Sequence, residues 1–341
     1  MTTTQIDKPA SSALLSRLKP NLETLPTLAA VAIFIGMLIY GEIAYGRIMQ
    51  FSTISNLLIN NAYLIILAVG LTFVILTGGI DLSVGAVIAI SSLVGVMLAN
   101  AGWNPIVVIV LMILIGSTFG LASGVLIQYF NVQPFIATLA MMFLARGLAA
   151  ILSTTPQRLE DDSPIRTLST EWKVYDGPKI NDLVTTPNVL IAAVVVIVAF
   201  FLLHRTRFGR TVYAIGGSEQ SALLMGLPVV RTKLLIYVIS GSLAGLAAVV
   251  YTSKLGIAQN ITGVGWELDA IAAVIIGGTL LTGGAGFVLG SVIGALVLGL
   301  MNVLVTRDGG IPPEATTIIT GGILLAFVLL QRVVVSRKRK T

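Results

Sequence analysis

Long apolar stretches dominate the chain, and polar residues gather between them. A helix needs about 20 consecutive apolar residues to cross the hydrocarbon of a bilayer. The runs are continuous and do not alternate with polar residues, so they predict helices and not barrel strands. We therefore expect an all-α polytopic membrane protein of about ten transmembrane helices, at residues 27–45, 53–77, 82–99, 105–129, 134–153, 187–203, 231–251, 268–282, 286–304 and 316–335.

The third and eighth of these spans are short, and glycines precede both. Gly78 and Gly79 lie before the third span, and Gly263 and Gly265 before the eighth. Short, glycine-interrupted segments in corresponding halves are typical of the central pathway of a transporter. Residues 74–85 and 274–284 also resemble each other, which favours an inverted repeat of two five-helix halves. Asp81 then either lines the pathway or caps a tight turn.

The polar segments divide the chain into regions. We expect a cytoplasmic tail at residues 1–26, a permease domain at 27–335 and a basic tail at 336–341. Within the domain, residues 154–187 form an outer loop, either a small folded cap or a solvated loop, and 204–228 form an inner region. With both termini inside, the inner segments hold 13 lysines and arginines against four acidic residues, Asp81 among them, as the positive-inside rule requires.

Composition excludes several other classes of protein. Of the 341 residues, 56% are hydrophobic and 11% charged, fewer charges than a soluble domain carries. There is no cysteine, and the one histidine, His204, has no second ligand near it in the sequence, so we expect no disulfide and no metal site. The net charge of +6 follows the topology, so its natural partner is anionic lipid and not nucleic acid.

Arg146 is the residue most costly to place in a membrane. It lies twelve residues into the span that begins at Pro134, and ionisable groups at such depth mark function or bond to carbonyls near the interface. Thr138 and Met142 share its helix face. We expect these three residues to border the pathway, where Arg146 either hydrates it or only snorkels to the outer interface.

Glu267 and Asp269 are the acidic pair at the start of the eighth span. Residues i and i+2 on a helix point to different faces, so the two carboxylates are poorly placed to act together as catalysts. Acidic groups suit a helix N-terminus, which favours a capping role at the pathway. A catalytic pair in an intramembrane enzyme that handles lipid-linked sugars is the competing interpretation.

The inner region contains a candidate docking helix. We expect Gly216 and Gly217 to break the chain, Ser218 to cap a short amphipathic helix and Pro228 to stop it. An exposed apolar helix on the inner side can bury its face only against lipid headgroups or a partner protein, and we favour the partner. The candidate coupling residues are Gly216, Gly217, Ser218, Glu219, Ala222, Met225 and Gly226.

The energy source must lie outside this chain. The sequence has no Gly-x-x-x-x-Gly-Lys-Ser/Thr motif, so it does not bind ATP through a P-loop. No acidic residue falls at the centre of a predicted span, which disfavours a proton-coupled secondary transporter. We expect a transport subunit that is not an enzyme and has no cofactor of its own, with ATP and Mg²⁺ bound by a partner.

Five motifs resemble those of one family over residues 55–335. They are Leu-Thr-Gly-Gly-Ile-Asp-Leu-Ser-Val-Gly (76–85), Pro-Phe-Ile-Ala-Thr-Leu (134–139) with Arg146-Gly147, His-Arg-Thr-Arg-Phe-Gly (204–209), Ala-Ile-Gly-Gly (214–217) and Gly-x-Glu-Leu-Asp-Ala-Ile-Ala-Ala-Val-Ile-Ile-Gly-Gly-Thr (265–279). The chain resembles the permease subunits of bacterial monosaccharide ABC importers of the ribose, xylose and galactofuranose type, and is most similar to a galactofuranose permease.

The resemblance implies a function and a set of partners. It implies a subunit of the bacterial inner membrane that imports a neutral, galactofuranose-like monosaccharide by alternating access, or another pentose or hexose such as ribose or xylose. It also implies a second permease subunit, in a heterodimer, with a pathway between the two. A cytoplasmic ATP-binding subunit would engage residues 216–226 as the coupling helix, and a periplasmic sugar-binding protein would deliver the cargo.

Overall fold

The computed structural model describes residues 25–177, 181–310, 312 and 315–338. Residues 1–24 and 339–341 of the expected tails lie outside this range, whereas 25–26 and 336–338 belong to helices. The described chain is helical with four short strands, which confirms the all-α membrane fold. Its longer helices are α2 (Leu25–Tyr45), α3 (Phe51–Leu76), α4 (Val84–Asn100), α5 (Pro105–Tyr129), α6 (Pro134–Leu152), α7 (Pro187–Arg205), α10 (Val229–Leu255), α12 (Val288–Asp308) and α13 (Ala315–Lys338).

Seven helices in the described part are long and apolar enough to cross a membrane: α2, α3, α5, α6, α7, α10 and α12. The shorter apolar helix α4 corresponds to the third predicted span, and the apolar segment Ala315–Leu329 of α13 corresponds to the tenth. The eighth prediction was wrong in extent, because α11 runs only from Trp266 to Ile276. Eleven residues extend about 16 Å, which is half of a bilayer's hydrocarbon core. Gly277 and Gly278 end this helix, and the apolar residues that follow form a loop.

Glycines let the central helices approach closely. A Cβ on Gly116 of α5 would lie 2.0 Å from the carbonyl oxygen of Gly241 in α10, and one on Gly120 would lie 2.2 Å from that of Tyr237. The same holds where Gly294 of α12 meets the carbonyl oxygen of Ala273 in α11, at 1.9 Å. Helix faces without side chains allow dense packing in lipid.

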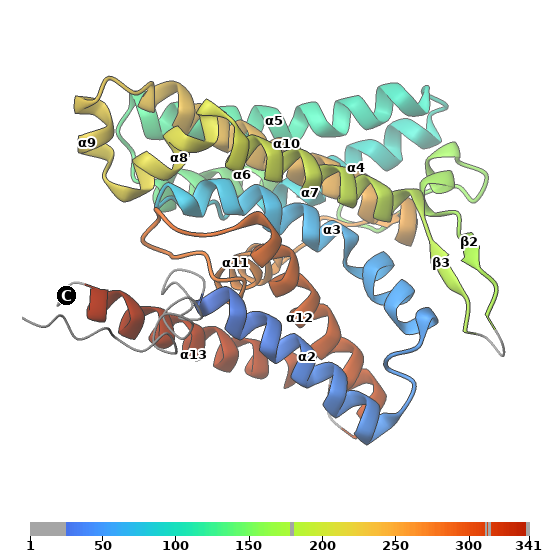
Figure 1. Cartoon of the computed structure of the whole chain (residues 1–341). Helices are drawn as coiled ribbons and strands as arrows, with labels where there is room; N and C mark the ends of the chain where they lie inside the picture. Colours follow the sequence, from blue (N-terminus) through green and yellow to red (C-terminus); the bar gives the residue numbers. More distant parts are fainter. Residues whose placement is uncertain (1–24, 178–180, 311, 313–314, 339–341) are drawn as a thin grey trace, which may run out of the picture.

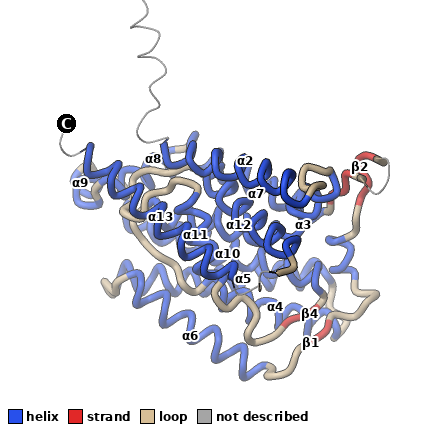
Figure 2. The backbone as a smooth tube through the Cα atoms, turned by 90° about the horizontal axis from the view of Figure 1, so that it is seen from below, coloured by secondary structure: helices blue, strands red, loops and turns tan. Residues whose placement is uncertain are grey.

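The bundle has two distinct ends (Figure 1). At one end lie the short helices α8 (Arg207–Gly217) and α9 (Glu219–Leu224), and at the other projects the hairpin of β2 (Trp172–Tyr175) and β3 (Leu183–Thr185). We call the first the α9 end and the second the hairpin end. In Figure 2, α2 and α13 lie side by side along one flank of the bundle. By the charge bias, we expect the α9 end to be cytoplasmic.

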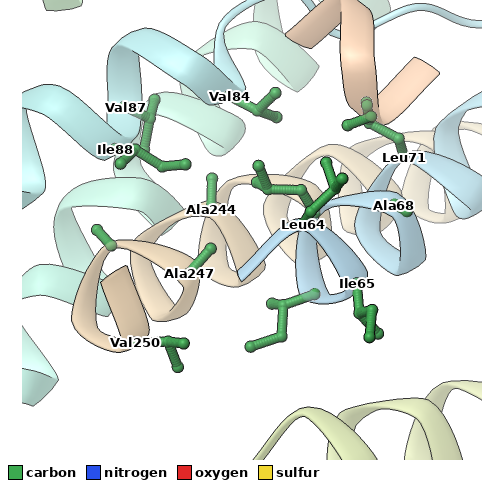
Figure 3. Close-up of a cluster of buried hydrophobic side chains, with 14 of the residues drawn as sticks. Leu64, Ile65, Ala68, Leu71, Val84, Val87, Ile88, Ala244, Ala247 and Val250 are labelled. Carbon is green, nitrogen blue, oxygen red and sulfur yellow. The ribbon is translucent and has the colours of Figure 1, made fainter. Parts of the chain in front are cut away.

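The core lies where α3, α4 and α10 meet. Figure 3 shows buried side chains from the three helices in one cluster: Leu64, Ile65, Ala68 and Leu71 of α3, Val84, Val87 and Ile88 of α4, and Ala244, Ala247 and Val250 of α10. In the most apolar stretch of α3, 83% of the residues are buried, whereas the corresponding stretches of α5 and α6 are 33% and 28% buried. Helix α3 is therefore central, and α5 and α6 keep broad apolar faces for lipid or for another subunit.

The segment 154–187 carries local structure at the hairpin end. β1 (Gln157–Arg158) pairs with β4 (Ile257–Ala258), and a 3₁₀ helix, η1, covers Pro164–Ser169. Leu159 is fully buried, and its amide donates to the carbonyl of Gly256 over 2.9 Å. The segment is therefore a small folded cap at this end and not a solvated loop.

Candidate functional site

Helix α9 is a short, firmly capped element. The Ser218 hydroxyl accepts a hydrogen bond from the amide of Ser221, so Ser218 is the N-cap that the sequence predicts. At the other end Met225 is the C-cap, and Gly226 has a φ of +73°. The amides of Gly226 and Leu227 donate to the carbonyls of Leu223 and Ala222, which is a Schellman motif. The local sequence thus defines a helix of about two turns.

One face of α9 is buried and the other is exposed. Ala222 is fully buried in a cluster with Ile215 of α8 and Val229 of α10. By contrast, Leu224 and Met225 are 85% and 66% exposed. An exposed apolar tip on a fixed element is a surface suited to a partner protein.

An ion pair ties α9 to α10. The Lys233 ammonium donates to both carboxylate oxygens of Glu219, over 2.8 and 2.9 Å. The Lys233 side chain is only 13% exposed, and that of Glu219 is 46% exposed. Glu219 also lies in the first turn of α9, where a negative charge is favourable. Lys233 was not among the predicted site residues, because its partner is 14 positions away and no local motif joins them.

The prediction that Gly216 and Gly217 break the chain was wrong, because the break lies one residue later. Both glycines belong to α8, and the chain turns at Ser218, whose backbone is extended. Gly216 instead marks a close contact: a Cβ there would lie 1.9 Å from the carbonyl oxygen of Leu76 and 2.3 Å from the amide of Gly284. A side chain at Gly217 would meet nothing within 4 Å. The two glycines therefore have different structural roles.

Three chain segments meet at Gly216, and we call this contact the glycine junction. It joins the end of α8 to Leu76 at the end of α3 and to Gly283 and Gly284 in the α11–α12 loop. The amide of Gly284 donates to the carbonyl of Leu76 over 2.9 Å. The two segments that resemble each other in sequence, 74–85 and 274–284, are thus hydrogen-bonded to each other next to the candidate docking helix.

Asp81 is a buried structural anchor. It was counted with the inner loops, and this placement was wrong, because the residue is fully buried inside the bundle. One carboxylate oxygen accepts from the amide and hydroxyl of Ser83, over 3.0 and 2.6 Å. The other accepts from the hydroxyl of Ser240 over 2.7 Å. Ser240 lies near the middle of α10, so Asp81 fastens the start of α4 to that helix at mid-depth.

Arg146 supports a loop. Its guanidinium donates to the carbonyl oxygens of Asn260 and Thr262 over 2.8 and 2.5 Å, and it interacts electrostatically with Glu267. These bonds agree with the second of the two predicted roles, in which Arg146 bonds to carbonyl groups near the interface. On the same helix, Thr138 is fully buried and its hydroxyl donates to Pro134 over 2.8 Å, while Met142 packs against the main core.

Glu267 and Asp269 lie in the first turn of α11. One Glu267 oxygen accepts from the amide of Gly265 over 3.3 Å, which fits the predicted capping role. The other lies against Gly85 at the start of α4, where a Cβ would come within 2.3 Å of it. Both residues are partly buried. Arg146, Glu267 and the loop before α11 are thus brought together, while α9 lies at the far end of the bundle.

Sequence reasoning missed an aromatic group beside this loop. The rings of Tyr63 and Trp266 lie 4.5 Å apart, and those of Tyr251 and Trp266 lie 4.8 Å apart. These residues come from α3, α10 and α11, so no sequence spacing links them. In the described part of the chain, His, Asp and Glu residues nowhere gather into a group that could hold a metal ion.

Comparison with known proteins decides the family. A family model described as "Branched-chain amino acid transport system / permease component" matches residues 53–328, which is most of the chain. The chain belongs to this permease family. The resemblance to permease subunits of monosaccharide ABC importers, drawn from the motifs, is confirmed.

The relatives match this permease over about three quarters of its length or more. It is 54% identical to the fructose import permease FruG of Bifidobacterium longum, over 93% of this chain and 94% of the relative. It is 41% identical to the inner membrane ABC transporter permease YjfF of Escherichia coli, over 90% and 92%. It is 40% identical to the ribose import permease RbsC of E. coli, over 74% and 78%. No solved structure matches it.

Proposed function

We propose that this permease moves a neutral monosaccharide inward across a bacterial inner membrane, driven by ATP hydrolysis in a separate subunit. The observation that carries the proposal is α9, an exposed apolar tip fixed to the bundle of a chain that has no P-loop. The relatives support a sugar as cargo. D-Fructose is the first sugar to test because of the 54% identical relative. Galactofuranose, the sugar expected from the motifs, stays a prediction.

The proposed partners follow from the exposed tip of α9 and from the permease family. An ATP-binding subunit holds ATP and Mg²⁺ and docks on α9, and a sugar-binding protein delivers cargo at the hairpin end. A second permease subunit, in a heterodimer, completes the pathway. Both termini of the chain are cytoplasmic in this arrangement, in line with the positive-inside bias.

The proposed mechanism is alternating access. Closure of the ATP-binding subunits moves α9, and Ala222 and the Glu219–Lys233 pair carry α8 and α10 along with it. The glycine junction passes this movement to the ends of α3 and the α11–α12 loop. The pathway then opens to one side at a time, as movement of packed helices about a central site allows.

The exposed tip of α9 provides the test. Leu224→Ser combined with Met225→Ser removes apolar surface from the docking face, and Ile197→Ser removes an exposed apolar side chain from the middle of α7, away from both ends of the bundle. ATP-dependent uptake of radiolabelled fructose and ribose is measured in cells that produce the whole importer. We expect uptake to fall to background only in the α9 variant, at equal abundance in the membrane.

Two results would contradict the proposal. Full uptake by the α9 variant would reject the docking role of α9. Uptake that an uncoupler abolishes and ATP depletion spares would instead show a proton-coupled secondary transporter.

A further inference from the structure

A pocket opens beside the loop that precedes α11. It has a volume of about 260 Å³, and its walls include Tyr251, Gln259, Thr262 and Trp266. Every residue that lines it is uncharged. Polar and apolar groups line it in similar measure, and a lining without charges favours a neutral ligand.

The aromatic wall is held rigidly. Trp266 packs on Tyr63 with an interplanar angle of 35°, and it meets Tyr251 edge to face at 74°. Aromatic rings in such arrangements support one another and offer a flat apolar surface. The C–H faces of a sugar ring complement a surface of this kind.

The pocket lining also includes polar side chains that can bond a ligand. Within the described residues, the side-chain amide of Gln259 makes no hydrogen bond to the protein. The Thr262 hydroxyl accepts from the backbone amide of Gln259 over 3.1 Å and keeps its own proton to donate. An amide and a hydroxyl beside an aromatic wall match a ligand with several hydroxyl groups.

The loop that carries these groups is preformed. Arg146 donates to the carbonyls of Asn260 and Thr262, and Gly256 accepts from Leu159. The loop therefore keeps its shape in the absence of ligand, which lowers the entropic cost of binding.

We propose that this pocket is a transient binding site for the neutral monosaccharide. The Trp266 ring faces one side of the sugar, and Gln259 and Thr262 bond its hydroxyls. Arg146 acts here as a positioning residue for the loop and does not touch the sugar. The inference rests on the proposed function, and because the pocket is small, it predicts weak binding.

Fluorescence of Trp266 reports directly on the pocket. The chain has three tryptophans, so Trp103→Phe with Trp172→Phe leaves Trp266 as the only one. The purified variant is titrated with D-fructose and D-ribose, and sodium gluconate controls for osmotic effects. We expect a saturable change in emission with either sugar and none with gluconate.

A matched pair of substitutions tests the polar wall. Gln259→Met keeps the side-chain length and removes the hydrogen bonds, so we expect affinity to fall roughly two- to tenfold. Gln133→Met, at an exposed residue before α6, should leave it unchanged. A flat titration, or equal affinity for Gln259→Met and the parent protein, would overturn the pocket assignment. If the titration succeeds and the whole importer shows no ATP-dependent uptake, the proposed function fails and the pocket stands.

Discussion

The glycine junction gives the sharpest prediction about this fold, through Gly216→Ala. The new methyl group would lie 1.9 Å from the Leu76 carbonyl oxygen and 2.3 Å from the Gly284 amide, both backbone atoms. Overpacking of this kind costs about 1–3 kcal/mol. The methyl group also intrudes on the hydrogen bond from Gly284 to Leu76, which is worth about 0.5–1.5 kcal/mol. Alanine recovers up to about 1 kcal/mol of helix propensity. We expect a net destabilisation of about 1–3 kcal/mol.

Gly217→Ala is the matched control for this substitution. It introduces the same methyl group one residue later, where nothing lies within 4 Å, so we expect unchanged or slightly higher stability. The assay is the thermal unfolding midpoint of each purified variant in detergent. A Gly216→Ala midpoint several degrees below that of Gly217→Ala is expected. Equal midpoints would refute the close contact on which the junction depends.

Three further predictions concern polar contacts. Replacement of Lys233 by glutamate should reduce the sugar imported per ATP hydrolysed, and the reciprocal Glu219→Lys in the same chain should restore it; the absence of rescue would dismiss the ion pair as a coupling element. Asp81→Ala leaves buried hydroxyls without their acceptor, so we expect a loss of about 1–3 kcal/mol in thermal unfolding, and an unchanged midpoint would argue against the anchor. At the hairpin end, the hydrogen bond from Lys173 holds the pKa of Asp182 below its usual 3.8. This contribution to hairpin stability is present above the unfolded pKa and is lost as pH falls through the lower folded pKa, so fluorescence of the hairpin tryptophan should change only at strongly acidic pH.

The amino-acid sequence predicted the helices well, because span length and continuity of apolar residues are set by the bilayer. It failed at the eighth span, where Gly277 and Gly278 end α11 inside an unbroken apolar stretch. Hydropathy counts those residues without regard to backbone conformation. Hydropathy therefore predicted a span up to residue 282, although the helix ends at Ile276.

The site could be predicted only where its contacts are local. The caps of α9 depend on neighbours within a few residues, and Ser218 was identified from them. Asp81 bonds to Ser240, 159 positions away, and Arg146 bonds to backbone carbonyls, which carry no side-chain signature. Such contacts follow from tertiary packing, and a single sequence does not encode them in its spacing.

The central claim is that this permease is a conduit moved by a separate nucleotide hydrolase. Reconstitution in liposomes tests it most directly, with the purified chain alone in one sample and the whole importer, including its ATP-binding subunit, in another. We expect accumulation of radiolabelled fructose only with the whole importer and only when ATP is supplied. Accumulation against a gradient by the chain alone, without nucleotide, would contradict the claim.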